Sequence, residues 1–130
     1  MTTANNNKKD RVLLVDDEPD IVYLTKIGLE RNGFEVDAYT DPLLALQNFK
    51  GGLYHLLLLD IKMPKMDGIE LFDRMKKEDD EVKVCFFSAS EHLTFNYKKL
   101  FQSSDRFLSV SKPISISEMT KQIKQFMSRQ

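Results

Sequence analysis

The chain has 130 residues and is poor in two features that would each point to a particular environment. Its only cysteine, Cys85, has no partner for an internal disulfide, so the sequence does not require an oxidising compartment. An excess of one charge is also missing, because 19 basic residues oppose 20 acidic residues and leave a net charge of -1. This balance disfavours direct binding to nucleic acid and to anionic membranes.

Long hydrophobic runs are equally scarce. The longest apolar stretch near the middle of the chain, Leu56 to Leu59, stops at Asp60 and is far too short to cross a bilayer. Met1 is followed by polar residues instead of the apolar stretch of a secretory signal. We therefore expect a soluble protein of the reducing cytoplasm, with no contact with the membrane.

The length and the hydrophobic content of 42% predict one compact domain. Residues 1–9 are mostly Thr, Asn and Lys, which offer little apolar surface to bury and so cannot offset the entropy lost on ordering. These residues are predicted to form a flexible tail. The folded domain is expected over residues 10–130.

From Arg11 onward, short apolar runs alternate with segments of helical periodicity, which is typical of βαβ units around a parallel sheet. Right-handed crossovers with one reversal predict the strand order 2-1-3-4-5, a doubly wound α/β three-layer sandwich. The expected strands cover 11–15, 34–39, 54–59, 82–87 and 107–110. The expected helices cover 19–32, 42 to the glycines at 51 and 52, 69–77, 91–102 and 115–127.

Unusual polar residues stand where these strands end: Asp16, Asp17, Asp60, Ser88 and Lys112. Ligands bind at the carboxyl edge of an open parallel sheet, and the predicted strand order places the ends of the first and third strands side by side. Three carboxylates would then converge, and their mutual repulsion requires a cation. Oxygen ligands favour Mg2+, with Mn2+ as an alternative, and the absence of His and Cys beside them disfavours zinc.

The other polar groups at this edge suit a phosphoryl group. Lys112 can neutralise one phosphoryl oxygen, the Ser88 hydroxyl can donate a hydrogen bond to another, and a backbone amide near Ala89 can donate a third. The neighbouring Glu18 and the turn residue Asp67 are assigned helix-terminal roles instead of metal binding. Cys85 is predicted to be buried and inert.

From Arg11 to Met127 the chain resembles the receiver domains of response regulators of two-component systems, in particular single-domain regulators similar to those of chemotaxis. The resemblance rests on motifs that follow in order at the strand ends: Asp16-Asp17-Glu18, Asp60 with Met63-Pro64 and Met66-Asp67-Gly68, Ser88-Ala89 and Lys112-Pro113. It implies a flavodoxin-like fold. It also implies a phosphoacceptor signalling domain that catalyses only its own phosphorylation and dephosphorylation.

By this resemblance, Asp60 takes a phosphoryl group from a phosphohistidine on a sensor histidine kinase or a phosphotransfer protein. The resemblance further implies that Asp17 and the backbone carbonyl of Lys62 bind the metal directly and that Asp16 binds it through water. Ser88, Lys112 and the backbone of Ala89 would contact the phosphoryl group. Lys62 and Ser90 occupy the positions that tune the lifetime of the aspartyl phosphate in this family.

The fifth strand departs from the family pattern. In the family, a hydroxyl residue at the position of Ser88 moves toward the phosphoryl group, and an aromatic residue three positions before the lysine turns inward. This chain has Ser109 at that position, and Phe107 stands two residues earlier. The segment from Ser88 to Lys112 is about two residues longer than usual, so a bulge in the fifth strand could bring Phe107 into the switch position.

The resemblance implies output through an unknown downstream protein that contacts the face of helix 91–102, strand 107–110 and helix 115–127. We expect a stand-alone receiver, monomeric or dimerising on phosphorylation, without direct nucleic-acid binding. The main alternative is a degenerate receiver that binds proteins independently of phosphorylation. An aspartyl phosphatase is disfavoured because Asp60 lacks a second acid two residues later, and a flavin binder because Asp16 and Asp17 would repel its phosphate.

Overall fold

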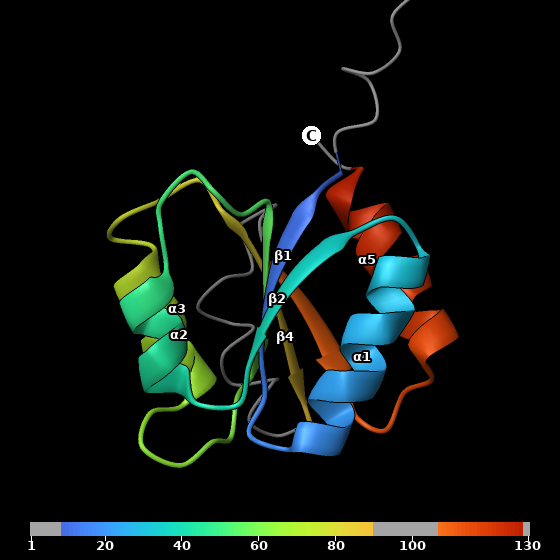
Figure 1. The fold of residues 1–130 in the computed structure, drawn as a ribbon, viewed down its shortest axis with the longest axis horizontal. Coiled ribbons are helices and arrows are strands. Elements are labelled where there is room, and N and C mark those ends of the chain that lie inside the picture. Colours follow the sequence, from blue (N-terminus) through green and yellow to red (C-terminus); the bar gives the residue numbers. More distant parts are fainter. Residues whose placement is uncertain (1–8, 90–106, 129–130) are drawn as a thin grey trace, which may run out of the picture.

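The computed structural model describes residues 9–89 and 107–128, which form one parallel sheet between two layers of helices (Figure 1). The sheet order β2-β1-β3-β4-β5 confirms the predicted doubly wound topology. As predicted, β2 is an edge strand. The strands are β1 (Arg11–Val15), β2 (Glu35–Tyr39), β3 (Leu56–Asp60), β4 (Lys83–Ser88) and β5 (Phe107–Ser111).

The helices of the described residues lie on both faces of the sheet, with α1 and α5 on one face and α2 and α3 on the other (Figure 1). The helix predicted over 91–102 lies outside the described residues. No helix in the described part of the chain is long and apolar enough to span a membrane. The helices are α1 (Pro19–Arg31), α2 (Pro42–Asn48), α3 (Gly68–Met75) and α5 (Ile116–Met127).

Side chains of the connecting segments set where the helices begin. Asp41, Asp67 and Ser115 each accept a hydrogen bond from a backbone amide in the first turn of the following helix, as expected of N-caps. Helix α1 has no side-chain cap, and it begins instead with Pro19, whose ring preorganises the first turn. Just after the other end of α1, Gly33 adopts a φ of 94°, the left-handed conformation that glycine commonly takes where a helix ends.

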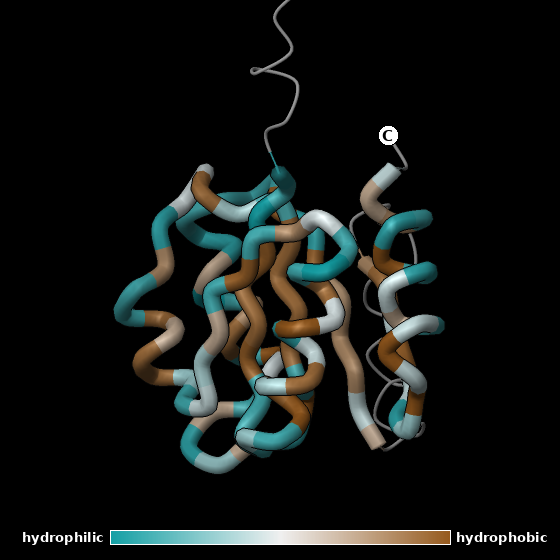
Figure 2. The backbone as a smooth tube through the Cα atoms, turned by 45° about the vertical axis from the view of Figure 1, so that its right-hand side comes forward, coloured by the Kyte–Doolittle hydropathy of each residue, from teal (hydrophilic) through white to brown (hydrophobic). Residues whose placement is uncertain are grey.

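Successive side chains of each strand point to opposite faces of the sheet, and this divides the core into two clusters, one on each face. Leu57, Leu59 and Phe86 pack toward α2 and α3, whereas Leu58 and Cys85 pack toward α1 and α5. Figure 2 shows the corresponding hydrophobic segments running through the middle of the fold. Cys85 is fully buried, and burial raises the pKa of its thiol, so it is protonated at neutral pH, as the prediction of an inert side chain requires.

The strand register aligns the carboxyl ends of the central strands. Val15 pairs with Leu59, so the residues that follow them, Asp16 and Asp60, lie at the same level of the sheet. On the other side of β3, Asp60 pairs with Phe87 of β4. Ser88, the next residue of β4, pairs with Ser111, which directly precedes Lys112. The predicted polar residues are thus delivered to one edge of the sheet, although Asp60 and Ser88 are the last residues of their strands instead of the first loop residues.

Candidate functional site

Three carboxylates meet at the carboxyl edge of β1 and β3. One oxygen from each of Asp16, Asp17 and Asp60 lies within 4.8 Å of the other two. Asp16 and Asp60 are buried, with residue exposures of 0% and 4%, and Asp17 is partly exposed. Asp16 is also held in place, because its Oδ1 accepts a hydrogen bond of 3.0 Å from the Glu18 amide.

Lys112 brings a single positive charge to these acids. Its backbone amide donates to the Ser88 carbonyl at 2.8 Å, which ties the end of β5 to the end of β4. Its Nζ donates to Asp16 Oδ2 at 3.0 Å and lies 3.6 Å from Asp60 Oδ1. Glu18, which sequence reasoning assigned to the helix alone, is mostly exposed but has Oε1 3.7 Å from the same nitrogen. The lysine therefore links both buried carboxylates.

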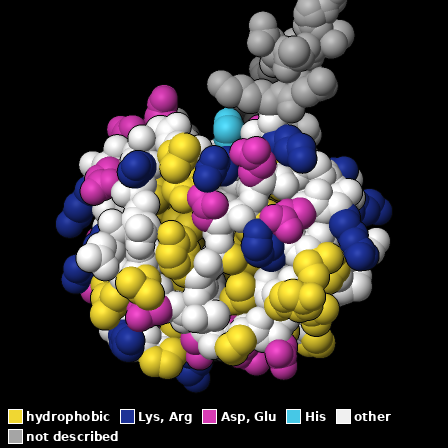
Figure 3. Space-filling view, viewed as in Figure 1, with side chains coloured by type: hydrophobic (Ala, Val, Ile, Leu, Met, Phe, Trp, Pro, Cys, Tyr) yellow, Lys and Arg dark blue, Asp and Glu magenta, His cyan; other side chains and the backbone are white. Residues whose placement is uncertain are grey.

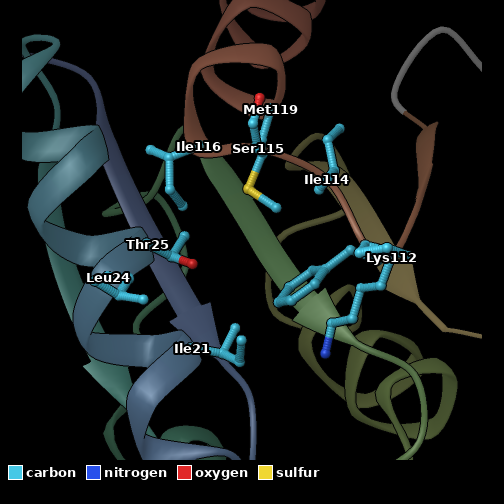
Figure 4. Close-up of a pocket in the computed structure, with 10 residues that line it drawn as sticks. Ile21, Leu24, Thr25, Lys112, Ile114, Ser115, Ile116 and Met119 are labelled. Carbon is cyan, nitrogen blue, oxygen red and sulfur yellow. The ribbon is translucent and has the colours of Figure 1, made fainter.

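The amine of Lys112 lies over an aromatic ring. The Lys112 Nζ lies 4.8 Å from the centroid of the Phe87 ring, a cation–π contact that sequence reasoning missed. Figure 4 shows the Lys112 amine pointing away from Ile114 and Met119, which line an apolar cleft between α1 and the start of α5. In the sequence, only the position of Phe87 next to Ser88 pointed to this contact. An aromatic residue in a buried strand is usually assigned to the hydrophobic core instead.

Burial and charge act together on the titration of the site. Burial, followed by the charge of Asp16, raises the pKa of Asp60 to about 7; the charge of Asp17 adds to this, and Lys112 opposes it. Burial alone would lower the pKa of Lys112, but the hydrogen bond to Asp16 and the charge of Asp60 outweigh it and raise that pKa. Three acids and one lysine leave net negative charge in oxygen-only surroundings, which fits Mg2+.

Gly68 positions the backbone of Asp60. A Cβ atom on Gly68 would overlap the carbonyl oxygen of Asp60, and the Gly68 amide donates to the Ile61 carbonyl at 2.8 Å. Asp67 caps α3, as predicted. The sequence indicated a turn at Asp67-Gly68, but it did not show that the glycine allows the helix to pack against the strand end that carries Asp60.

The loop from Asp60 to α3 has a second anchor. Lys65 has a φ of 72°, which is unfavourable for a residue with a side chain. Its Nζ donates to Asp41 Oδ2 at 3.1 Å, while Asp41 Oδ1 accepts from the Leu43 amide at 2.9 Å and caps α2. The hydrogen bond from Lys65 and the one from Leu43 lower the pKa of Asp41. Lys62, in the same loop, is exposed.

Ser88 and Ala89 lie at the same edge of the sheet. Ser88 ends β4 with an exposure of 1%, and Ala89 directly after it is exposed. Ser90, which the resemblance assigned to the tuning pair, lies outside the described residues. The register of β4 with β3 and β5 places Ser88 between the strand ends that carry Asp60 and Lys112.

The register of β5 locates the two switch candidates. Pairing with β4 runs without interruption from Phe107 to Ser111, so the bulge considered from the sequence is absent from this described strand. Ser109 pairs with Phe86, and Phe107 pairs with Val84, one side-chain repeat farther from the carboxyl edge. The Phe107 ring packs against the Phe86 ring with centroids 5.5 Å apart. Ser109 thus lies nearer the site, and Phe107 belongs to the core on the α2 and α3 side.

Comparison with known proteins extends this description. Residues 12–124 match the family model of the response regulator receiver domain. The transcriptional regulatory protein PrrA of Mycobacterium leprae is 32% identical over 119 residues, which cover 92% of this chain and 50% of that protein. The alkaline phosphatase synthesis transcriptional regulatory protein PhoP of Bacillus subtilis is 30% identical over 95% of this chain and 50% of its own length. The chain spans about half the length of these curated relatives.

Solved structures agree with this match. A CheY-like response regulator receiver domain protein from Methanospirillum hungatei superposes with a TM-score of 0.80 at 28% identity, covering 92% of this chain and 94% of that one. The response regulator protein TrrA from Thermotoga maritima, solved in complex with Mg(2+)-BeF, superposes with a TM-score of 0.75 at 31% identity over 90% and 98% of the two chains. The chain belongs to the response regulator receiver domain family, whose members act in two-component signalling.

Proposed function

We propose that this receiver accepts a phosphoryl group on Asp60 from a phosphohistidine in a Mg2+-dependent reaction and signals to a protein partner by conformational change. The observation that supports this proposal is the convergence of Asp16, Asp17 and Asp60 oxygens within 4.8 Å. Lys112 Nζ stands 3.6 Å from Asp60 in the same site. A purely structural cluster of turn acids does not require two buried carboxylates that share one lysine.

The proposed metal ligands are the carboxylates of Asp17 and Asp60, the backbone carbonyl of Lys62, and Asp16 through water. These are all oxygen donors, the type that Mg2+ and Mn2+ prefer. When bound, Mg2+ supplies positive charge that keeps the carboxylates ionised and neutralises oxygens of the phosphoryl group. Asp16 already has one oxygen fixed by the Glu18 amide, so it can hold a water ligand in a defined direction.

In the proposed reaction, a phosphoryl group is transferred from an imidazole nitrogen of the donor to a carboxylate oxygen of Asp60. An oxygen of Asp60 attacks the phosphorus, the new O–P bond forms as the P–N bond breaks, and the imidazole of the donor leaves. Lys112 would pair with one phosphoryl oxygen, the Ser88 hydroxyl would donate to a second, and the amide of Ala89 would donate to the same group. A water molecule in line with the O–P bond would later hydrolyse the aspartyl phosphate, with Lys62 and Ser90 adjusting its access.

The donor is proposed to be a sensor histidine kinase or a phosphotransfer protein, and the output a protein that contacts the face formed by residues 91–102, β5 and α5. Ser109 bears on this output. Because no aromatic ring occupies its position on β5, movement of Ser88 would be reported by a small side chain and by the adjoining backbone. The receiver domain is proposed to cover residues 10–130, with residues 1–9 as a tail.

The test uses a small phosphodonor and intact mass. The protein is incubated with acetyl phosphate, with Mg2+ or with a chelator, and compared with Asp60→Asn. We expect wild type to gain the mass of one phosphoryl group only in the presence of Mg2+, and the variant to gain none. Wild type that stays unmodified with acetyl phosphate and with a phosphohistidine donor would contradict the proposal.

Ser109 in place of an aromatic residue favours a second candidate, the degenerate receiver that binds its partner without phosphorylation. Capture of the downstream protein separates the two functions. Binding that is equal for wild type and Asp60→Asn, with and without phosphodonor, supports the degenerate receiver. Binding that changes on phosphorylation of wild type alone supports the phosphorylation switch.

A further inference from the structure

The side chain of Lys112 crosses a neighbouring strand to reach the acids of the site. Lys112 follows β5, whereas Asp60 ends β3 and Asp16 follows β1, and β4 lies between β5 and β3. Neighbouring strands are about 5 Å apart, so the acids stand two and three such spacings from β5. The residue of β4 at this level is Phe87, which pairs with Asp60 on one side and with Val110 on the other. The lysine therefore passes over Phe87 on its way to the acids.

Alternation along the strands puts the ring of Phe87 on the same face as the lysine. Phe87 belongs to the core cluster on the α1 and α5 side of the sheet, together with Leu58 and Val110. Asp60 stands two residues after Leu58 on β3 and therefore shares this face. Lys112, two residues after Val110, continues the same alternation, and its Nζ lies 4.8 Å from the centroid of the Phe87 ring. In Figure 4 the amine of Lys112 points toward the end of β3.

The contact between the amine and the ring is largely shielded from water. The Lys112 side chain is 16% exposed, whereas the Lys and Arg side chains in the other ion pairs of the described residues are at least 36% exposed. Figure 3 shows Lys and Arg side chains projecting from one face of the molecule, where water surrounds their charge. Phe87, by contrast, is fully buried. A cation–π contact is stronger when the cation is desolvated, so this ring restrains the amine more than a surface contact would.

We propose that Phe87 is a positioning residue, whose ring holds the Lys112 amine where it meets a phosphoryl group on Asp60. This inference rests on the proposed function and adds a residue to it. The amine is shared between Asp16 at 3.0 Å and Asp60 at 3.6 Å, and the charges of both carboxylates change when a metal and a phosphoryl group bind. Of these three partners only the ring keeps its attraction, because it neither binds the metal nor reacts. Without the ring, ordering the amine for the transfer would cost more conformational entropy.

Matched substitutions on β4 separate the ring from its bulk. Phe87→Leu removes the ring and keeps an apolar side chain, and Phe86→Leu makes the same change one residue earlier, where the side chain is also buried but packs toward α2 and α3. In NMR spectra of the metal-free protein, the ring current should shift the Lys112 ε-methylene protons upfield in wild type and Phe86→Leu, but not in Phe87→Leu. With saturating Mg2+, acetyl phosphate should phosphorylate Phe87→Leu about fivefold more slowly than wild type, and Phe86→Leu at nearly the wild-type rate.

A fluorinated ring tests the electrostatics of the contact and leaves the packing almost unchanged. A trifluorinated phenylalanine in place of Phe87 has nearly the same volume, but its fluorines withdraw electrons from the face of the ring and weaken the attraction for a cation. It should slow phosphorylation about threefold and leave Tm close to that of wild type. The same fluorinated residue in place of Phe86 should leave the rate unchanged.

The outcomes distinguish a failure of this inference from a failure of the proposed function. Wild type that acetyl phosphate and a phosphohistidine donor leave unmodified contradicts the proposed function and removes the role of Phe87 with it. If wild type is phosphorylated but Phe87→Leu and Phe86→Leu are slowed equally, or not at all, Phe87 only packs the core and the positioning role is overturned. An upfield shift of Lys112 that survives in Phe87→Leu also overturns it, as does an unchanged rate with the fluorinated ring in place of Phe87.

Discussion

Lys112 Nζ lies closer to Asp16 than to Asp60, with separations of 3.0 Å and 3.6 Å. The lysine therefore neutralises Asp16, one of the carboxylates on which the proposed metal site depends. If Asp16 takes part in the proposed metal site, Lys112 and the metal would compete for this carboxylate. A lysine released from Asp16 would be close enough to Asp60 to pair with a phosphoryl group there, which would couple metal binding to readiness for phosphorylation.

Replacing this lysine tests the competition. Lys112→Met keeps most of the apolar stem against Phe87 and removes the charge, so Mg2+ affinity should rise about tenfold because a nearby repelling charge is lost. Titration of Mg2+ followed by NMR chemical shifts measures the affinity. Lys26→Met, which removes a charge paired with Glu30 on α1, is the control and should leave the affinity unchanged. Unchanged or weaker binding in Lys112→Met would show that the lysine does not oppose the metal.

Asp60 should make the metal-free protein sensitive to pH. Its pKa of about 7 in the folded protein exceeds the ordinary value of 3.8, so the unfolded chain releases this proton first as pH rises. Stability contributed by the protonated form is complete below pH 4 and is lost as pH rises to about 7. Asp60→Asn should therefore be more stable than wild type at pH 8, by roughly 2–4 kcal/mol, and nearly equal to it at about pH 4. Urea unfolding in chelator at both pH values measures the difference.

The same protonation should oppose Mg2+ binding. Because the metal binds ionised carboxylates, the increase in Tm caused by Mg2+ should be small at about pH 5 and should grow as pH rises through about 7. Thermal melts with and without Mg2+ across this range check the trend. In Asp60→Asn, any increase in Tm that Mg2+ still causes should lose most of its pH dependence over this range. An increase in Tm that is constant with pH in wild type would contradict the role of Asp60.

Gly68→Ala should damage the site as well as the fold. The new methyl group would overlap the Asp60 carbonyl, and the strand end or the start of α3 must shift, at a cost of about 1–3 kcal/mol. Mg2+ affinity should fall with it. Gly33→Ala is the matched control, because its φ of 94° imposes strain of about 1–2 kcal/mol, but its Cβ would meet no atom within 4 Å. Equal Mg2+ affinities of the two variants would argue against a positioning role for Gly68.

Lys65 allows backbone strain to be separated from an ion pair. Both Lys65→Ala and Lys65→Gly remove the pair with Asp41, which is worth roughly 0–1 kcal/mol at this exposure. Only glycine relieves the φ of 72°, so Lys65→Gly should be more stable than Lys65→Ala by about 1 kcal/mol. Equilibrium unfolding in urea of the two variants gives this difference directly. Equal stabilities would mean that the loop relaxes in Lys65→Ala.

Local patterns explain why much of the fold was predictable. The continuous run from Leu56 to Leu59 can only be buried on both faces, and it became the central strand β3. Asp41, Asp67 and Ser115 each cap a helix because a short polar side chain before a helical segment satisfies free amides. Strand ends were less predictable: β3 and β4 each continue through the polar residue that was expected to follow them, because ladder pairing and not polarity decides where a strand ends.

The amino-acid sequence by itself determined the strand order and the edge of the sheet to which Asp16, Asp60, Ser88 and Lys112 are delivered, because periodicity and chain connectivity act locally. Only the tertiary structure decided which of these side chains meet. The pairing of Lys112 with Asp16 joins residues 96 positions apart, and the packing of Gly68 against Asp60 depends on where α3 lies. Such contacts depend on interhelical distances and side-chain conformations within the packed core, which the pattern of polar and apolar residues does not specify.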